Sequence, residues 1–519
     1  MTEFSAQSLA NLSWAFANLV VVDEPVLAAI AASSKAKAAE FSAQGLSNTV
    51  WSLAVLELFD RPVLDAMAEI AKSRVWEFSE QNIANTAWAF ASLSYRHTTL
   101  LNALAAQARE TLLGWQEQGL SNLAWAFARL RFQDGPVFAV LAAAATRQLA
   151  DFTLQGLANI AWSFVELEVR EAPLLGKIFD KAMAKLQIAS TEAATRPCGD
   201  GDVEAVLSLS QALSSCGLFT AEVHAETEKL LTMLARRLDG GGSGEAAYAG
   251  SGAQEEDLRL LDGKDPVILH ADVDLVALWK PPNWTVSVSS EGTTFRAQAK
   301  GPQDAGLPLQ DWVAKNLGCR HPVCADASKS YGLLHRLDRF TSGIVLCATT
   351  YRGHLLGQLR FATRQVKKVY LALCTGTVAP HPRTLEARLS GERAPDGSWR
   401  TWADANGRTA KTEILRVVHL CDGTMHFSLV EVQLHTGRQH QIRAHLAEEG
   451  HPLVGDVQYG GAAPKWCPRT FLHAARVGLH VGNGDFDVRC PLPADVSRAL
   501  SKLEPSGPQG RSQLKMLLR

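Results

Sequence analysis

Apolar and polar side chains follow a helical period through the first half of the chain, and the whole pattern recurs every 37 residues. In the first repeat Leu9, Leu12, Phe16 and Leu19 follow one another at spacings of three and four residues, which places them on one face of an amphipathic helix. A second, Ala-rich apolar stretch follows a short polar break, as in residues 26–38. Each repeat therefore predicts a pair of helices. The positions that recur at this period are an aromatic residue (Phe4, Phe41, Phe78, Trp115, Phe152), a glutamine (Gln7, Gln44, Gln81, Gln118, Gln155), an asparagine (Asn11, Asn48, Asn85, Asn122, Asn159) and a tryptophan (Trp14, Trp51, Trp88, Trp125, Trp162).

One helical pair of this length cannot bury its apolar face alone, so consecutive pairs are expected to stack into an α-solenoid. Ser5, Ser42 and Ser79 each stand immediately ahead of a helix, where a serine suits the N-cap. Residues 203–216 resemble a sixth, degraded unit. The first half is therefore predicted to be an all-α domain of about six repeats over residues 1–238.

The recurring positions allow two interpretations. The tryptophans and leucines are expected to form the core. The asparagines and glutamines either bond the adjacent helix inside the stack or line the concave face and contact RNA bases. We favour the structural role for the asparagines because they are invariant between repeats, whereas a residue that reads a base sequence should vary.

The hydrophobic pattern changes after a stretch at residues 240–257 that is first rich in Gly, Ser and Ala and then acidic. Short apolar runs separated by turns replace the helical period, and few long helices intervene. We therefore predict a flexible linker over residues 239–264 and, over residues 265–519, an α+β domain with a largely antiparallel sheet. The predicted strands are residues 275–279, 344–347, 369–374, 414–420 and 427–434.

Charge divides the chain at the same places. Residues 1–238 hold 18 Lys and Arg against 25 Asp and Glu, a net charge of −7, whereas residues 265–519 carry +9 and the segment between them −4. The second half is thus the electrostatic partner for a polyanion. Because each repeat of the first half carries few cations, a protein partner for the repeats stays open beside RNA.

Composition narrows the remaining classes of protein. The nine cysteines include no Cys-x-x-Cys pair, which favours free thiols in a reducing compartment. Cys319, His321 and Cys324 lack the second ligand pair of a zinc site, so no metal is expected. No apolar stretch approaches the twenty residues of a membrane span, and the first residues lack the basic region of a secretory signal. An upstream targeting segment could still precede them.

The segment HRLDRFTSG, residues 335–343, places one carboxylate in a compact polar frame. Asp338 precedes a Thr-Ser-Gly turn and the apolar run 344–347, which is expected to be a buried strand. A carboxylate held this way at a sheet edge suits a nucleophile or a general base. A turn Asp that caps its own backbone is the alternative.

A second polar cluster, TGRQHQIRAHL, occupies residues 436–446 and contains Arg438, His440 and Arg443 without matching acids. Such a cluster is typical of a site for phosphate or for a lone carboxylate. A turn-rich segment, GHPLVGDVQYG, follows at residues 450–460.

These two segments together resemble the RluA-type family of pseudouridine synthases, whose marks are an HRLDxxTSG-like motif and a later TGRxHQIRxHL…GHPxxGDxxYG. Four further motifs keep the family order: KP at 280–281, KVY at 368–370, FLHA at 471–474 and PLP at 491–493. The resemblance covers roughly residues 265–500. The helical repeats resemble the heptatricopeptide and octotricopeptide class, which is associated with organellar RNA binding.

The resemblance implies that the second half isomerises specific uridines in RNA to pseudouridine, with Asp338 as the nucleophile on a flipped-out base. It implies that Arg443 keeps Asp338 ionised, and that Tyr370 stacks on the target uracil where a proton must be moved. Arg336 is expected to fill the space of the flipped base or to contact phosphate. The other residues expected to bind substrate or phosphate are His335, Arg438, His440 and Lys280.

The isomerisation needs no redox step and no group donor, so no cofactor is expected. The expected partner is RNA (rRNA, tRNA or mRNA), with the repeats assisting recognition of RNA or of a protein, and the chain is expected to be a monomer. The alternative is an RNA- or protein-binding organellar factor whose synthase domain is inactive; the presence of Asp338, Tyr370 and Arg443 argues against it. The repeat class points to a chloroplast or mitochondrion, with cytoplasm or nucleus as alternatives.

Overall fold

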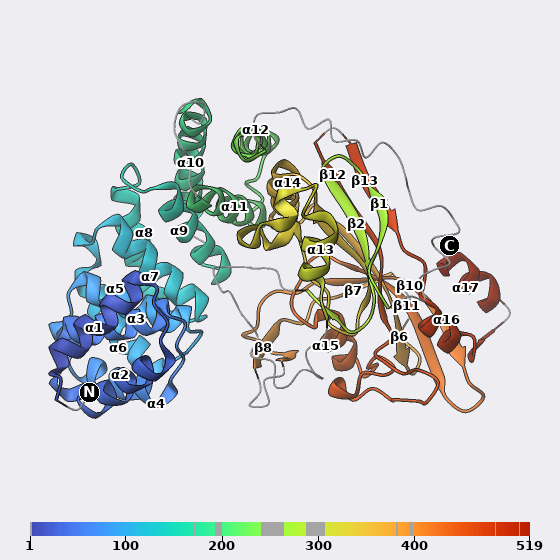
Figure 1. Cartoon of the computed structure of the whole chain (residues 1–519), viewed down its shortest axis with the longest axis horizontal. Helices are drawn as coiled ribbons and strands as arrows, with labels where there is room; N and C mark the ends of the chain where they lie inside the picture. The colour runs from blue at the N-terminus through green and yellow to red at the C-terminus, as the bar shows by residue number, and fades with distance from the viewer. Residues whose placement is uncertain are drawn as a thin grey trace. The chain divides into compact units, whose positions relative to one another are not determined.

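The computed structural model describes residues 3–169, 172–192, 200–239, 264–286, 307–379, 382–393, 399–482, 484–507 and 509–518. The chain divides into unit 1, Met1–Leu230, and unit 2, Leu231–Arg519 (Figure 1). The division falls inside helix α12 (Ala221–Leu238). The linker predicted over 239–264 lies outside the described residues, except for its two end residues.

Unit 1 is a stack of helical pairs, as the 37-residue period predicts. The first helices of the pairs pack on one another in chain order, and the second helices pack on one another less closely. The first helices are α1 (Ala6–Leu19), α3 (Ala43–Val55), α5 (Glu80–Ser92), α7 (Glu117–Arg129), α9 (Leu154–Glu166) and α11 (Asp200–Ser215), and the second are α2 (Glu24–Ala36), α4 (Arg61–Ser73), α6 (Thr98–Thr111), α8 (Gly135–Arg147), α10 (Ala172–Glu192) and α12.

Local sequence explains where the first helices begin and end. The hydroxyls of Ser5, Ser42 and Ser79 accept hydrogen bonds from backbone N–H groups in the first turn, which confirms the predicted N-caps. After each of the helices α1, α3, α5, α7 and α9, one residue takes a left-handed conformation, and this turn leads into the second helix. These residues recur at the 37-residue period and are Val20, Glu57, Ser94, Arg131 and Glu168.

Burial within the repeats agrees with the prediction for the aliphatic positions and corrects it for the tryptophans. The recurring aliphatic position, Leu9 in the first repeat and Leu157 in the fifth, is fully buried. Trp14, in contrast, is 49% exposed, and the other four repeated tryptophans are half-buried. Trp88 and Trp125 stack between neighbouring repeats with ring centroids 6.5 Å apart. The tryptophans therefore lie at the edge of the core and keep part of their surface exposed, and Trp51 still packs against the core cluster of the first repeats.

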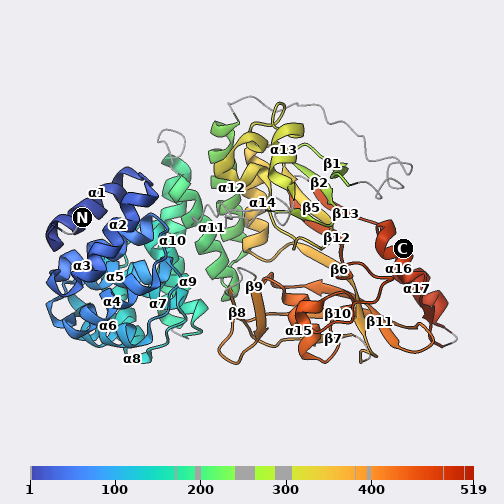
Figure 2. The ribbon, with the colours of Figure 1, turned by 60° about the horizontal axis from the view of Figure 1, so that its bottom comes forward.

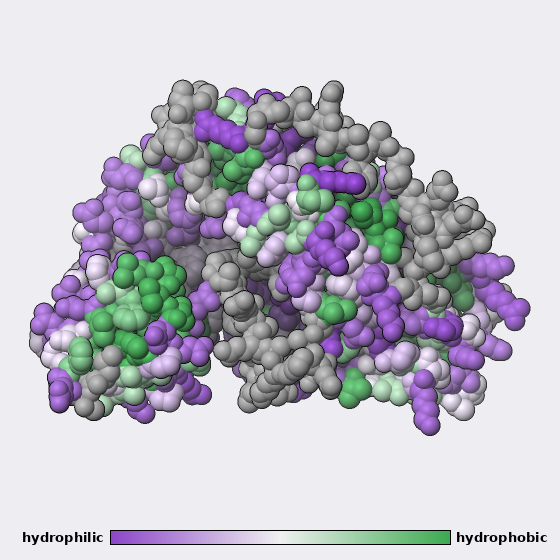
Figure 3. Space-filling view, viewed as in Figure 1, coloured by the Kyte–Doolittle hydropathy of each residue, from purple (hydrophilic) through white to green (hydrophobic). Residues whose placement is uncertain are grey.

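The preference for a structural role of the asparagines is also wrong. Within residues 3–169, the side-chain amides of Asn11, Asn48, Asn85 and Asn122 bond no other residue, and that of Asn159 accepts from Gln155 of its own helix at 2.8 Å. The repeated glutamines are all exposed. Because glutamine, asparagine and tryptophan stand at i, i+4 and i+7, they form one stripe along each first helix. We call these fifteen residues, three in each of α1, α3, α5, α7 and α9, the amide–tryptophan stripe. Hydrophobic residues also gather over α1, α3 and α5 on the face of unit 1 drawn in Figure 3.

In the described part of unit 2, ten strands form one sheet that is antiparallel except between β5 and β12, which confirms the predicted α+β fold (Figure 2). The order is β1-β2-β5-β12-β6-β11-β10-β14, with β13 beside β12 and β7 beside β10. All five predicted strands are present, as β2, β5, β6, β10 and β11. The strands are β1 (Val267–Ala271), β2 (Leu275–Lys280), β5 (Ser342–Ala348), β6 (Lys367–Thr375), β7 (Arg383–Leu385), β10 (Thr412–Cys421), β11 (His426–Leu434), β12 (Leu472–Val481), β13 (Gly484–Arg489) and β14 (Glu504–Pro505).

Two apolar clusters, one centred on β5 and β6 and one including α16 (Ala494–Leu500), form the core around this sheet. Helix α15 (Gln441–Glu448) packs against the small hairpin of β8 (Leu389–Arg393) and β9 (Trp399–Ala403), and the three lie together in both ribbon views. Among the described residues, no helix is long and apolar enough to cross a bilayer.

Candidate active site

The register of three strands brings the predicted catalytic segments together. Ala474 of β12 pairs with Gly343 of β5 on one side and with Tyr370 of β6 on the other. Gly343 has a φ of +124°, and a Cβ at this position would lie 2.3 Å from the carbonyl oxygen of Ala474. Only glycine permits so close an approach. The turn that carries Asp338 therefore enters the sheet beside Tyr370.

Asp338 lies in this turn, just ahead of β5. The backbone N–H of Thr341 donates to the carbonyl of Asp338 at 3.0 Å and closes the turn. The preceding Leu337 is buried in the core, whereas the Asp338 side chain keeps 24% of its surface exposed. The carboxylate is thus held by a rigid backbone and is still open to a ligand.

Helix α15 and the residue before it bring two nitrogens close to this carboxylate. Arg443 Nη1 lies 3.7 Å and His440 Nε2 3.8 Å from Asp338 Oδ2. His440 has a left-handed backbone conformation, with φ of 55°, at the N-terminus of α15. The segments 335–343 and 436–446, which are distant in sequence, therefore meet at Asp338.

Arg443 is nevertheless bonded chiefly to a residue that the sequence did not single out. Its Nε and Nη2 donate to the carboxylate of Asp456 at 2.6 and 2.8 Å, and Nη2 also donates to Gln458 at 2.8 Å. The guanidinium lies over the ring of Tyr459 at 4.7 Å from its centroid. All three partners belong to GHPLVGDVQYG, which the sequence identified only as a turn-rich family motif. The sequence signal for these contacts is the presence of an Asp and a Tyr in this motif, shortly after a motif that contains Arg443 and no acidic residue.

His440 is uncharged near neutral pH. Burial lowers its pKa to about 4, because the attraction of Asp338 only partly offsets the desolvation of the imidazolium. The ring Nδ1 lies 3.0 Å from the hydroxyl of Tyr459, and that hydroxyl also accepts from the N–H of Thr401 in β9 at 2.9 Å. The positive charge beside Asp338 therefore comes from Arg443.

Tyr370 is 7% exposed and lies in the core cluster around the active site. Burial, and secondarily the negative charge of Asp338, raise the pKa of its phenol well above the usual value. The hydroxyl is therefore protonated at neutral pH and can donate a hydrogen bond or a proton, but it cannot act as an anionic base.

Two residues that were expected to bind substrate hold the backbone instead. Lys280 has no exposed surface, and its ammonium donates to the carbonyls of Pro281, Trp284 and Arg339 at 2.9, 2.9 and 3.1 Å. Burial is the main reason that its pKa falls to about 7. With every donor used inside the protein, Lys280 cannot reach RNA, and the prediction for it is corrected.

His335 is also engaged internally. Its Nε2 accepts from the backbone N–H of Leu346 at 3.0 Å, and its half-buried ring stacks on Phe361 at 5.0 Å. Desolvation lowers the pKa of His335 to about 3, so the ring is neutral and fixes β5 instead of binding phosphate.

The side chains of Arg336 and Arg438 both keep contact with solvent. The Arg336 side chain is exposed and has no hydrogen-bond or ion-pair partner among the described residues. Arg438 is half-buried, and its Nε donates to the carbonyl of Thr409 at 3.1 Å. In the part of the chain that the structure describes, no group of three or more His, Cys, Asp and Glu side chains is arranged to hold a metal ion.

Comparison with known proteins identifies the family of unit 2. A family model described as RNA pseudouridylate synthase matches residues 275–448, which contain Asp338, Tyr370 and Arg443. An uncharacterized RNA pseudouridine synthase of Mycobacterium bovis is 31% identical over 254 residues, which are 48% of this chain and 76% of that relative. The chain belongs to the RNA pseudouridine synthase family. Its motifs are those of the RluA type, as the sequence predicts.

Other relatives match the synthase domain over different lengths. An uncharacterized RNA pseudouridine synthase of Chloroflexus aurantiacus is 39% identical over 178 residues. The matched residues are 33% of this chain, and the chain spans only 54% of the length of that relative. The solved structure of human RNA Pseudouridylate Synthase Domain Containing 1 is 22% identical with a TM-score of 0.37, covering 50% of this chain and 96% of that one.

The repeats ahead of the synthase domain match a different model. Residues 1–135 match a family described as RNA-editing substrate-binding complex 6 protein. The helical array is therefore similar to that family, and the match does not single out the heptatricopeptide and octotricopeptide class.

Proposed function

We propose that the synthase domain isomerises uridine in RNA to pseudouridine, with Asp338 as the nucleophile. The observation that carries the proposal is the position of this carboxylate: it is partly exposed, held by a fixed turn, and flanked by Arg443 and His440 at 3.7 and 3.8 Å. The reaction breaks the N-glycosidic bond, rotates the base and joins C5 to C1′, so hydrogen leaves C5 and no cofactor is consumed. Attack of Asp338 on C1′, attack on C6 of the base, and a trigger for proton removal from the sugar are all compatible with this position.

The neighbours of Asp338 take distinct roles in the proposal. Arg443, oriented by Asp456, places its positive charge beside the Asp338 carboxylate while the bound RNA excludes water. Tyr370 stacks on the extruded uracil, and its protonated hydroxyl donates to the base. Arg336, which is exposed beside Asp338, occupies the space that the flipped base leaves or contacts its phosphate.

The helical array is the second part of the proposal and assists the recognition of RNA. The amide–tryptophan stripe supports this role, because half-exposed tryptophans can stack on bases and free amides can bond base edges. The similarity of residues 1–135 to a family described as RNA-editing substrate-binding complex 6 protein points the same way. An organelle, suggested by the resemblance of the repeats, is the proposed compartment. The alternative is that a protein partner docks on the array. This alternative stays open because the array carries a net charge of −7, which does not favour binding of the RNA backbone.

Release of tritium from RNA labelled at C5 of uridine tests the activity directly. The full chain is incubated with [5-³H]uridine-labelled transcripts of rRNA and tRNA, and the same RNAs are mapped for pseudouridine. Asp338→Asn should lower the rate at least about a hundredfold, the smaller end of what one acid, base or nucleophile contributes. Asp485→Asn, which changes an exposed carboxylate of β13, is the matched control and should leave the rate unchanged.

The outcomes separate the candidate functions. Undiminished release by Asp338→Asn would show that another group acts as the nucleophile. If the unaltered chain binds these RNAs but releases no tritium from them, the synthase domain serves only in binding.

A further inference from the structure

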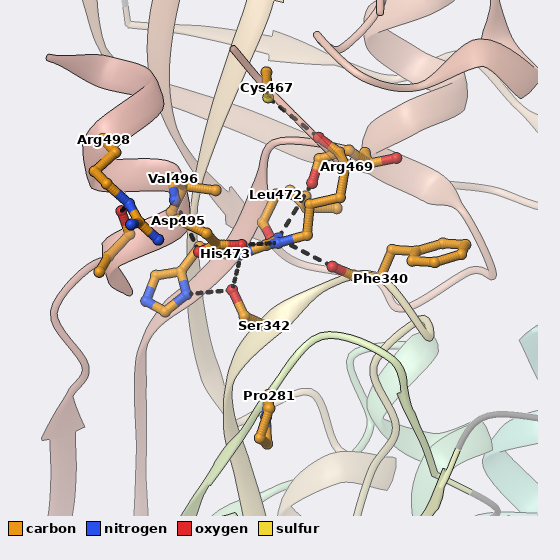
Figure 4. Close-up of polar contacts among 12 residues, drawn as sticks. Pro281, Phe340, Ser342, Cys467, Arg469, Leu472, His473, Asp495, Val496 and Arg498 are labelled. Atoms are coloured by element: carbon orange, nitrogen blue, oxygen red, sulfur yellow. Dashed lines mark hydrogen bonds and ion pairs between the residues drawn. The ribbon is translucent and has the colours of Figure 1, made fainter. Parts of the chain in front are cut away.

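Arg469, which precedes β12, uses its whole guanidinium inside the protein although no sequence motif drew attention to it (Figure 4). Its Nε and Nη2 donate to the carboxylate of Asp495 in α16 at 2.6 and 3.2 Å. Nη1 donates to the carbonyl of Phe340 at 3.0 Å, and Nη2 donates to the hydroxyl of Ser342 at 2.9 Å. One side chain therefore joins α16 to the turn that follows Asp338.

This turn is held from a second direction by Lys280. Its ammonium donates to the carbonyl of Arg339 at 3.1 Å, so the first two carbonyls after Asp338 are each bound by a different buried cation. Lys280 comes from the end of β2 and Arg469 from the chain ahead of β12. Because each peptide unit is planar, fixing these two carbonyl groups also fixes the orientation of the turn.

Burial of a cation is expensive unless it is compensated. Lys280 has three backbone carbonyls as partners, whereas Arg469 has a carboxylate. Asp495 neutralises Arg469: burial would raise the pKa of its carboxyl, but the hydrogen bond and the charge of Arg469, together with the backbone N–H of Val496, lower it. Ser342 also lies 3.0 Å from Nδ1 of the buried His473, which extends the network into β12. Such a network fixes a unique geometry only while every member is satisfied.

Asp338 depends on this support because, among the described residues, its carboxylate makes no short hydrogen bond, and the nearest nitrogens lie 3.7 and 3.8 Å away. Arg443 belongs to α15 and is bonded to Asp456, and its closest approach to Asp338 is 3.7 Å. The carboxylate and the guanidinium are thus anchored by separate parts of the fold. Their separation depends on how firmly each anchor holds.

We propose that Arg469, neutralised by Asp495, is a positioning residue that fixes residues 339–342 and so the orientation of the Asp338 carboxylate. The proposal rests on the proposed function, in which Asp338 reacts with the target uridine. It assigns to Arg469 an effect on the rate of the chemical step and none on the affinity for RNA, because the residue is only 9% exposed and its guanidinium is bonded inside the protein.

The substitution Arg469→Lys tests this assignment in the full chain. Lysine keeps the positive charge beside Asp495, but a single ammonium cannot also reach Phe340 and Ser342. The single-turnover rate of tritium release should fall about a hundredfold, the loss expected from a displacement of about 1 Å, while the Kd for the same RNA stays within about threefold. The matched control is Arg360→Lys in α14 (Tyr351–Ala362), because Arg360 is also buried and donates to His480 and Gln365, away from the turn.

Each outcome of these measurements decides the assignment. It is overturned if Arg469→Lys keeps the normal rate, if the loss appears in the Kd instead of the rate, or if Arg360→Lys loses activity to the same degree. If Arg469→Lys does not fold, Asp495→Asn replaces it, since this change leaves the guanidinium in place without its neutralising carboxylate. A normal single-turnover rate for a folded Asp495→Asn would equally overturn the proposal.

Amide hydrogen exchange supplies a readout that does not depend on activity. In Arg469→Lys the amides of residues 339–342 should exchange at least about tenfold faster than in the unaltered chain, and those of the strand β11 should not change. Arg360→Lys should leave residues 339–342 unaffected. If the unaltered chain modifies no RNA, the proposed function fails, and the exchange result alone then decides whether Arg469 fixes the turn.

Discussion

At the scale of single residues, the separation between Asp338 and Arg443 shows how the site is arranged. Arg443 forms its two short charged hydrogen bonds with Asp456, at 2.6 and 2.8 Å, and faces Asp338 only at 3.7 Å. Its charge thus acts on Asp338 without a short salt bridge that a substrate would have to displace. Because His440 is neutral, it adds no second charge that would weaken the carboxylate as a nucleophile.

The depressed pKa of His440 predicts how the stability of the fold depends on pH. The native state keeps this ring neutral down to about pH 4, whereas an unfolded chain protonates it near its usual value of about 6.5. Between these values the unfolded state binds more protons, so the free energy of unfolding falls as the pH falls. The native state of the unaltered chain should therefore lose up to about 3 kcal/mol relative to His440→Asn between pH 6.5 and pH 4.

Asparagine is the suitable replacement because it does not titrate and tolerates the left-handed backbone at this position. Urea denaturation at a series of pH values, followed by intrinsic fluorescence, measures the difference between the two chains. Parallel curves for both would mean that His440 is already protonated in the native state, and the assignment of a neutral ring would then be wrong.

At the scale of elements, the strands and helices could be predicted from the sequence because each has a strong local signal. The five strands from β2 to β11 and the N-caps at Ser5, Ser42 and Ser79 all follow from patterns within a few residues. The anchoring of the site could not be predicted in this way. Asp456 and Arg469 act through partners that lie far away in sequence or in another element, and no local pattern shows whether a charged side chain is buried.

The same limit explains the errors. Lys280 and His335 belong to motifs that resemble those of the family, and a family motif does not separate residues that contact substrate from residues that hold the backbone. The repeated tryptophans were expected in the core because large aromatic residues usually are buried. Each repeated tryptophan lies seven residues after a repeated glutamine, so the two side chains lie on the same stripe of the helix. Because these glutamines are exposed, the spacing indicates that the tryptophans also reach the surface.

The ion pair between Arg443 and Asp456 ties helix α15 to the turn that follows it, so breaking the pair should lower the stability of the fold. Asp456 has a side chain only 1% exposed, so Arg443→Met would leave a buried carboxylate without its partner. Breaking a buried pair in this way lowers the free energy of unfolding by about 3–5 kcal/mol. The double variant Arg443→Met, Asp456→Asn removes the uncompensated charge and should recover part of that loss, as measured by urea denaturation.

The control for this pair is Asp338→Asn, which removes a partly exposed carboxylate and should leave stability nearly unchanged. If the double variant were no more stable than Arg443→Met alone, the loss would come from missing arginine packing and not from the unpaired carboxylate of Asp456.

At the scale of the whole molecule, charge and chemistry are distributed unequally between the two parts. Residues 265–519 carry +9 and include exposed cations such as Arg336, whereas residues 1–238 carry −7 and present aromatic rings and amides. In the proposed role, an array of this composition would bind RNA through stacking more than through phosphate neutralisation, so its binding should depend less on salt than that of a basic groove. In the proposed role, the invariance of the stripe from repeat to repeat fits contacts with what is common to every nucleotide.

The stacked pair Trp88 and Trp125 allows this division to be tested. Replacing both with alanine in the full chain should weaken the binding of single-stranded RNA by about tenfold or more, since stacking contributes about 1–3 kcal/mol for each base. The rate of tritium release at saturating RNA should not change, because both residues lie in the array. Trp76→Ala is the matched control: this tryptophan is 72% exposed and lies outside the amide–tryptophan stripe. Equal weakening by Trp76→Ala, or unchanged binding by the double variant, would rule out the stripe as the RNA contact and leave a protein as its partner.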